Sequence, residues 1–378
     1  MTIRSRRPSV RVVVLAVTLI VALAAGGALA AQAPADLTRL RTAAEGGDAE
    51  AQFALGVRYA TGGGVATDDA EAARWIERAA VQGHAGAQFN LGLMYADGNG
   101  VPQDSRQAVA WLRRAADQGD ARAQSNLGLM YANGSGVPLD TAIAFDWYRK
   151  AALQNELAAQ FTLGLMYAAG TGVTADAGAA AQWFLKAAER GHVLAAYNAG
   201  LAYARGLGVA RDAARAAGWF RAAADQGDAQ SQFTLGTMYA NGAGVARDDA
   251  QATIWYRRAA EQGLASAQTN LGARYVSGHG VAVDPAEAAR WFERAARQGD
   301  AGAQFNLGVL YANGTGVAPD AVRAYVLLAW AAQRASGSER ARYAAARDTV
   351  AASLAPAQLA EARVLAAGTE LPWPDVTR

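Results

Sequence analysis

Apolar residues recur along the chain in two alternating segments, each with the spacing of an α-helix. In the first segment, Ala51, Leu55 and Tyr59 stand at positions i, i+4 and i+8, which places them on one face of a helix predicted from about Ala49 to Thr61. The second segment carries an apolar stripe and predicts a helix from about Ala70 to Gln82. We call these helix A and helix B.

The pair of segments returns with a strict period. A Gly-Val pair falls at Gly64-Val65 and again every 36 residues as far as Gly316-Val317, without insertion or deletion. A fixed period of this size predicts a solenoid of stacked units, which needs no single spherical core. The eight repeats are 47–82, 83–118, 119–154, 155–190, 191–226, 227–262, 263–298 and 299–334. A chain that is 52% hydrophobic is not expected to be disordered.

Glycine and aspartate stand at fixed places in each repeat. Glycine inside a helix costs about 1 kcal/mol relative to alanine, yet Gly56 and Gly92 have equivalents in all eight helices A. We therefore expect a close approach of the partner helix there. Gly64 is expected to take a positive φ. Asp68 and Asp104 precede helix B and are expected to cap its free N–H groups.

The aromatic residues of the repeat are interpreted as structural. Seven of the nine tryptophans, Trp75 and Trp111 among them, stand at one position of helix B, and Tyr59 and Tyr95 share one position of helix A. A residue that recurs in every repeat is assigned to structure, because an active site is needed only once.

The pattern A-Q-F-N-L-G-x-x-Y-x-x-G-x-G-V-x-x-D, best seen from Ala87 to Asp104, resembles the Sel1-like repeat, a relative of the tetratricopeptide repeat. The resemblance covers residues 47–334. It implies an all-α fold: a right-handed superhelical solenoid of eight 36-residue helix-turn-helix repeats with helical caps. Gln52 stands where the tetratricopeptide signature has tryptophan, and the loop between the helices is longer here.

The segments outside the repeats are expected to cover the ends of the stack. Residues 31–46 predict an N-terminal capping helix that resembles a lone helix B. Residues 335–378 predict C-terminal capping helices, at about Ser338–Leu354 and Pro356–Ala367, followed by an extended tail. The eighth helix B is expected to run longer, since Ala335 replaces the terminal glycine.

Residues 1–30 have the layout of a secretory signal peptide. Four arginines precede an uncharged run from Val12 to Ala31, and Ala28-Leu29-Ala30 is a small-x-small cleavage site. The expected location is therefore periplasmic or secreted. The alternative is an uncleaved anchor in the inner membrane, because a run of 20 residues can span a bilayer.

Charge and cysteine content exclude several classes of protein. Removal of residues 1–30 takes away four arginines and no acids, so the formal charge falls from +2 to −2 and no basic excess remains for nucleic acid. The absence of cysteine excludes disulfides and thiolate metal sites. Contact with a membrane is expected only through an uncleaved N-terminal segment.

No motif for catalysis or for a cofactor is found. The sequence has no S-x-x-K and no G-x-S-x-G, and the G-x-G loops lack the context of a nucleotide-binding strand. His84 and His192 occupy the same position of the repeat, three repeats apart, and are therefore too far from each other to share a metal. They are interpreted as surface or inter-repeat residues. We expect no enzyme, no metal and no cofactor.

Two rows of side chains on helix A remain as candidates for binding. Asparagines from Asn90 to Asn306 either hold an extended peptide or bond the turn of the neighbouring repeat. By resemblance to tetratricopeptide arrays, the second row faces the concave surface, where it would form an apolar groove; the alternative is packing between successive helices A. We call this row the apolar ladder: Phe53, Phe89, Leu93, Phe161, Leu165, Tyr197, Phe233 and Phe305.

The resemblance implies a non-enzymatic exported adaptor that binds a protein or peptide through this face, in envelope assembly, secretion or host contact. The alternative is a protein of the cell envelope that binds glycans or β-lactams, or an enzyme acting on them. The repeat pattern is not expected to identify the partner.

Overall fold

The structure is a computed structural model that describes residues 33–368 and 373. Within these residues every regular element is an α-helix. The helices A are α2 Ala49–Thr61, α4 Ala85–Asp97, α6 Ala121–Asn133, α8 Leu157–Ala169, α10 Val193–Arg205, α12 Ala229–Asn241, α14 Ala265–Ser277 and α16 Ala301–Asn313. The helices B are α3 Asp69–Val81, α5 Ser105–Asp117, α7 Thr141–Leu153, α9 Ala177–Glu189, α11 Ala213–Asp225, α13 Asp249–Glu261, α15 Pro285–Arg297 and α17 Ala321–Arg334.

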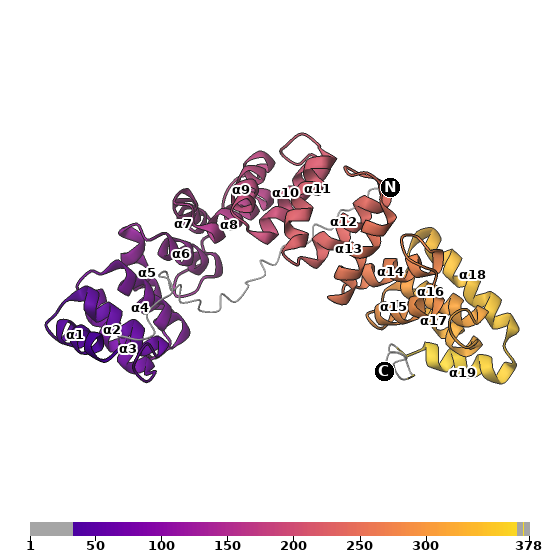
Figure 1. The fold of residues 1–378 in the computed structure, drawn as a ribbon, viewed down its shortest axis with the longest axis horizontal. Helices are drawn as coiled ribbons and strands as arrows, with labels where there is room; N and C mark the ends of the chain where they lie inside the picture. The colour runs from indigo at the N-terminus through magenta and orange to yellow at the C-terminus, as the bar shows by residue number, and fades with distance from the viewer. Residues whose placement is uncertain (1–32, 369–372, 374–378) are drawn as a thin grey trace. The chain divides into compact units, whose positions relative to one another are not determined.

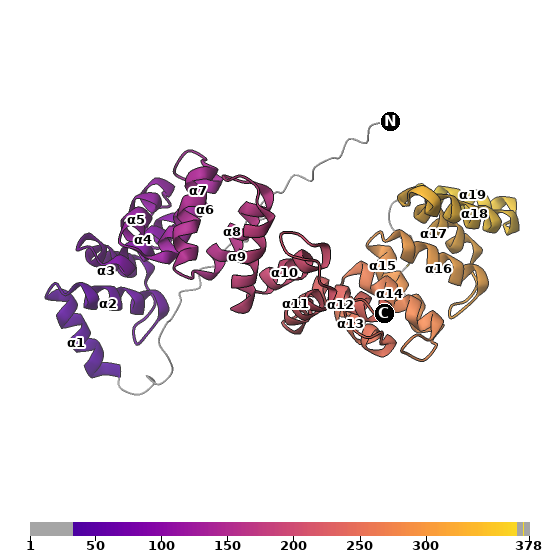
Figure 2. The same cartoon turned by 90° about the horizontal axis from the view of Figure 1, so that it is seen from above.

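The chain divides into two compact units, residues 1–187 and 188–378. In each unit, helices A pack on the helices B that follow them, as α2 does on α3 and α10 on α11. Helices B pack in turn on the next helices A, as α3 does on α4 and α11 on α12 (Figures 1 and 2). The all-α solenoid of eight repeats predicted from the period is therefore confirmed.

The two helices of a repeat cross closely at the glycine of helix A. A Cβ built on Gly56 would lie 2.6 Å from Cγ1 of Ile76, and one on Gly92 would lie 2.7 Å from Cγ of Leu112. Such distances leave no room for a methyl group, so the glycine that weakens the isolated helix permits the packing of the pair. The expected close approach is confirmed.

Each helix B begins at its aspartate. The carboxylate of Asp68 accepts a hydrogen bond from the backbone N–H of Glu71 at 2.9 Å, and Asp104 accepts from the N–H of Arg106 at 2.8 Å. These bonds satisfy donors that have no partner inside the helix. The valine of the loop, Val65, is half-buried.

The second glycine of the loop contacts the preceding repeat. Gly136 has φ +72°, and a Cβ there would lie 2.2 Å from the carbonyl oxygen of Ser105, at the start of the preceding helix B. Gly64 also has a positive φ, +88°, but a Cβ on it would approach only Arg58, because no complete repeat precedes it. In repeats 2, 3, 4, 6, 7 and 8, this glycine therefore serves the contact between repeats as well as the turn.

A buried glutamine links successive repeats, which the sequence analysis did not foresee. Gln88 is 5% exposed; its Nε2 donates to the carbonyl of Ala80 at 3.1 Å, and its Oε1 accepts from Nε2 of Gln118 at 2.7 Å. The same pair of bonds is formed by the equivalents of Gln88 at Gln52, Gln124, Gln232 and Gln268. In repeat 5 the position is Ala196, and Gln226 instead bonds the carbonyl of Ala222.

The ends of the described chain carry additional helices. Helix α1 (Ala33–Glu45) packs on α2 as a lone helix B, and α17 is one residue longer than the other helices B. Helices α18 (Gly337–Ser353) and α19 (Pro356–Ala366) both pack on α17. The predicted signal peptide lies outside the described residues, and no helix within them is both long and apolar enough to cross a membrane.

Candidate functional site

The apolar ladder lies on the helices A and is partly accessible. Phe53, Leu93, Phe161, Tyr197, Phe233 and Phe305 are half-buried, while Leu165 is 38% exposed. Phe89 is the exception, since only 7% of it is exposed. The ladder is therefore a set of side chains that pack on one side and reach solvent on the other.

The packed side of the ladder contacts helix B of the same repeat. The ring centroids of Phe161 and Phe184 are 6.0 Å apart, and those of Phe233 and Tyr256 are 5.7 Å apart. At some positions of the ladder, a polar side chain of the next repeat lies over the ring. The guanidinium of Arg122, for example, is 4.5 Å from the ring centre of Phe89. Each ring is thus held in place by core contacts, which limits the entropy lost when a partner covers it.

The last position of the ladder is covered by the chain itself. Tyr343 of α18 stacks on Phe305 with the ring centroids 4.4 Å apart, and Arg342 lies 5.0 Å from the ring centre. Helix α18 follows α17 as a further helix A would. The accessible ladder is therefore formed by the repeats before the eighth.

The asparagine row does not bond the neighbouring repeat where its bonds are defined. Nδ2 of Asn126 donates to the carbonyl of Arg122 at 2.9 Å, and Nδ2 of Asn198 donates to that of Leu194 at 2.7 Å. Both acceptors lie four residues earlier in the same helix. The predicted bond to the adjacent turn is therefore wrong at these two positions; the inter-repeat bond is made by the glutamines.

Arginine side chains contact the recurrent tryptophans and tyrosines. Trp75 is half-buried beneath Arg78, whose guanidinium is 4.5 Å from the ring centre, and Trp111 is buried with Arg114 at 4.3 Å. Tyr59 is half-buried, and its hydroxyl accepts a hydrogen bond from Arg41 at 3.0 Å. Tyr95 has a raised pKa, first because of burial and then because Glu77 and Asp104 are near. These contacts support the structural assignment of both series.

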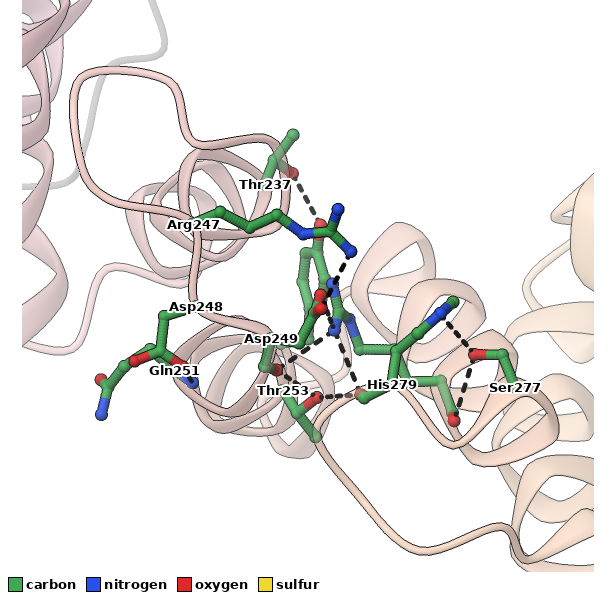
Figure 3. Close-up of polar contacts among 10 residues, drawn as sticks. Thr237, Arg247, Asp248, Asp249, Gln251, Thr253, Ser277 and His279 are labelled. Carbon is green, nitrogen blue, oxygen red and sulfur yellow. Dashed lines mark hydrogen bonds and ion pairs between the residues drawn. The ribbon is translucent and has the colours of Figure 1, made fainter.

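A polar cluster between repeats 6 and 7 departs from the repeat pattern (Figure 3). Arg274 stands where four of the eight repeats have methionine, and its side chain is only 10% exposed. Its Nη1 donates to Oδ1 and to the carbonyl of Asp249, and to the carbonyl of His279, each at 3.1 Å. Thr253 donates to the same His279 carbonyl at 3.0 Å. The loop of repeat 7 is therefore fastened to the preceding helix B by polar bonds.

The chemistry of this cluster is that of an ion pair. Hydrogen bonds from Arg274 and then from Arg247 lower the pKa of Asp249, so the carboxylate stays charged. Nδ1 of His279 is 2.9 Å from Oγ of Ser277, but both residues are exposed. Beside the cluster, Thr253, Ile254 and Arg257 line a cavity of about 300 Å³. A position-by-position comparison of the repeats points to Thr253, which stands at a position that is alanine in four repeats, and to Arg274, although Arg58 of repeat 1 shares the position of Arg274.

The histidines and acids of the described chain offer no site for a metal. No group of three or more histidine, aspartate or glutamate side chains is arranged to hold an ion among the described residues. Nδ1 of His84 accepts from the N–H of Ala87 at 3.0 Å, and its Nε2 is 3.0 Å from Glu50. His192 caps its helix in the same way, accepting from the N–H of Ala195 at 3.2 Å.

Comparison with known proteins identifies the repeat. The Sel1 repeat family matches eight times in succession, at residues 49–84, 85–120, 121–156, 157–192, 193–228, 229–264, 265–300 and 301–336. The chain belongs to the Sel1 repeat family. Sel1-repeat solenoids are generally non-enzymatic and mediate protein–protein interaction as scaffolds.

Two solved structures are similar over most of the chain. One is a Sel1 repeat protein from Oxalobacter formigenes, with 36% identity, a TM-score of 0.62, and coverage of 83% of this chain and 91% of that one. The other is a protective antigen present in uropathogenic Escherichia coli strains, which displays an SLR fold, with 31% identity, a TM-score of 0.57, and coverage of 87% and 93%. No curated protein matches the chain.

Proposed function

From membership of the Sel1 repeat family and from the accessible ladder, we propose that this protein is a non-enzymatic adaptor that binds a protein or peptide partner along its helices A. The observation that carries the proposal is a row of apolar side chains that are held by core contacts yet reach solvent, with Leu165 the most exposed of them. Rigid apolar anchors of this kind are typical of binding surfaces.

The residues beside the ladder indicate the chemistry of the partner. The asparagines next to it, from Asn90 to Asn306, are half-buried, so their amides remain near the surface. Amides can bond the backbone of an extended segment, while the apolar side chains accept its side chains. The partner segment is therefore an extended peptide with apolar side chains.

The test compares two substitutions of exposed leucines in the same unit. Leu165→Glu places a charge on the ladder, whereas Leu153→Glu places one at the end of α7, where the side chain is 63% exposed. Purified proteins with matched helical circular dichroism are used to capture partners from the envelope fraction, and affinity for the recovered partner is then measured. We expect Leu165→Glu to lower the affinity at least about tenfold, equivalent to about 1.4 kcal/mol, and Leu153→Glu to leave it unchanged.

Equal loss in both variants, or no loss in either, would remove the ladder from the proposal. Phe89 is left intact because it is buried, and a charge there would disturb the core. A labelled β-lactam retained covalently by the wild-type protein would instead favour the alternative of an envelope enzyme.

We also propose that the protein acts outside the cytoplasm, in the periplasm or after secretion, with a role in envelope assembly, secretion or host contact. The support is the signal-peptide layout of residues 1–30. N-terminal sequencing of protein from fractionated cells tests it: a periplasmic protein that begins at Ala31 is expected. A membrane-bound protein that retains Met1 would favour the anchored alternative.

A further inference from the structure

Trp373 of the C-terminal tail lies against the helix B side of repeats 7 and 8. Only 9% of its surface is exposed, and it belongs to the apolar cluster that includes Leu354 and Ala366. The guanidinium of Arg323 on α17 lies 5.2 Å from the centre of its ring. Nη2 of Arg297 on α15 donates to its backbone carbonyl at 3.3 Å. A segment beyond the last helix is therefore held through both its ring and its backbone.

The residues that hold Trp373 depart from the repeat pattern. At the position of Glu293, four of the other repeats have an arginine, and Arg257 there donates to the hydroxyl of Tyr275 in the next repeat at 2.7 Å; repeat 1 has Glu77. Arg297 is the one basic residue at its position among the eight repeats. Repeat 7 thus combines a carboxylate at the first position with a cation one turn later, a combination that no other repeat has.

Glu293 and Arg297 form an ion pair that supports Trp373. Glu293 is 2% exposed, and its Oε1 accepts a hydrogen bond from Nη2 of Arg297 at 2.7 Å. A buried carboxylate requires such a partner. Because the same Nη2 also bonds the carbonyl of Trp373, Glu293 orients the arginine that grips the tail.

We propose that Glu293, Arg297 and Arg323 form a docking site for an aromatic residue on an extended peptide, and that the chain's own C-terminal segment fills it through Trp373. The site lies on helices B and is independent of the ladder on helices A. Recognition rests on the ring face and on the backbone carbonyl. Nε1 of Trp373 has no hydrogen-bond partner among the described residues, so the site does not require the indole N–H.

The tether determines when the site is available. Trp373 follows Gly368 by five residues. Attachment through so few residues gives an effective concentration in the millimolar range. The chain's own tryptophan therefore outcompetes an identical segment from solution, including that of a second copy, unless it is removed or displaced.

The test uses the full-length chain with Trp373→Ala and a fluorescein-labelled peptide of residues 368–378, followed by fluorescence anisotropy. We expect saturable binding to Trp373→Ala and at least about tenfold weaker binding to the wild type, whose site is filled. Adding Arg297→Ala and Arg323→Ala to the variant is expected to abolish binding. Arg290→Ala, on the same helix α15 but paired with Glu287, is the matched control and is expected to leave binding unchanged.

Three results would overturn the proposal: no saturable binding to Trp373→Ala, equal binding to variant and wild type, or undiminished binding after both arginines are removed. A peptide with alanine in place of tryptophan must fail to bind, since otherwise the ring is not recognised. If Trp373→Ala loses its helical circular dichroism, Trp373→Phe takes its place. The site tolerates that ring, so the labelled peptide is then expected to bind between the wild-type and the Trp373→Ala levels.

Discussion

The interface between repeats 2 and 3 and the interface between repeats 6 and 7 have the same backbone but different side chains. In the first, Met130 is 8% exposed and packs in one apolar cluster with Val109 and Leu112 of the preceding helix B. In the second, Arg274 occupies the equivalent position and pairs with Asp249. A methionine that fits any apolar gap is thus replaced by a cation that needs a specific partner.

The features that the two interfaces share are backbone contacts. A Cβ on Gly136 would lie 2.2 Å from the carbonyl of Ser105, and one on Gly280 would lie 2.0 Å from that of Asp249. Gln124 and Gln268 each donate to the preceding helix B at 3.1 Å. The comparison shows that glycine and glutamine fix how repeats stack, which leaves the methionine position free to vary.

The largest effect is expected from the shared glycine. Gly136→Ala and Gly280→Ala should each lower the free energy of unfolding by at least about 3 kcal/mol, because strain at positive φ adds to a clash with a backbone carbonyl. Urea denaturation measures this. Gly119→Asn is the control: Gly119 has φ +95° with nothing near its Cβ, and Asn155 occupies the equivalent position. If one of the two variants lost much less stability than the other, the glycine would not have the same role at both interfaces.

The buried glutamine comes next. Gln124→Leu and Gln268→Leu should each cost about 1–3 kcal/mol, because each leaves a buried carbonyl and a second glutamine without their partner. Similar losses at both interfaces in urea denaturation are expected. Conversely, Ala196→Gln supplies the residue that repeat 5 lacks and should stabilise the protein by about 1 kcal/mol. Stabilisation by Gln at this position but no loss at Gln124 would contradict the assigned role.

The ion pair itself is expected to contribute less than its burial suggests. The double variant Arg274→Met, Thr253→Val introduces the residues of the apolar interface, Met130 and Val109, and should leave stability unchanged or raise it, as apolar replacements of ion pairs often do. Calorimetry compares it with the wild type. Marked destabilisation would mean that the polar bonds to the loop, not the packing, hold repeats 6 and 7 together.

The smallest effect is a dependence on pH that only the polar interface shows. Arg274 and Arg247 lower the pKa of Asp249 below its ordinary value of 3.8, so its contribution to stability is complete above that value and is lost as the pH falls through the folded pKa. Asp249→Asn should be less stable than the wild type at pH 7, and the difference should shrink as the pH falls below about 4. A difference that stays constant down to pH 3 would exclude the pair as its cause.

The fold could be predicted from the sequence because the same local signals for helices, caps and turns recur in all eight repeats. Gly56, Asp68 and Gly64 each serve a local need: a close crossing, a helix cap and a positive φ. The ladder was predicted by resemblance, and its role in binding stays a prediction. What could not be predicted is which of its members are covered, since Tyr343 lies 38 residues after Phe305 in the chain.

The contacts between repeats were the least predictable. One of the two interpretations of the asparagine row was a bond to the neighbouring repeat. The glutamines make that bond instead, because their longer side chains reach the carbonyl of the preceding helix B, while Asn126 bonds its own helix. The sequence placed Trp373 in an extended tail. The residues next to it in the chain do not indicate that Arg297 and Arg323 contact it.

The sequence by itself determined the helices, their ends and the number of repeats, because these depend on residues within a few positions of one another. Only the tertiary structure decided which polar groups meet over long separations in the chain: Gln118 with Gln88, Arg274 with Asp249, and Arg297 with the carbonyl of Trp373. These pairings bring together residues 25 to 76 positions apart, and they depend on side-chain length and burial that a periodic pattern does not encode.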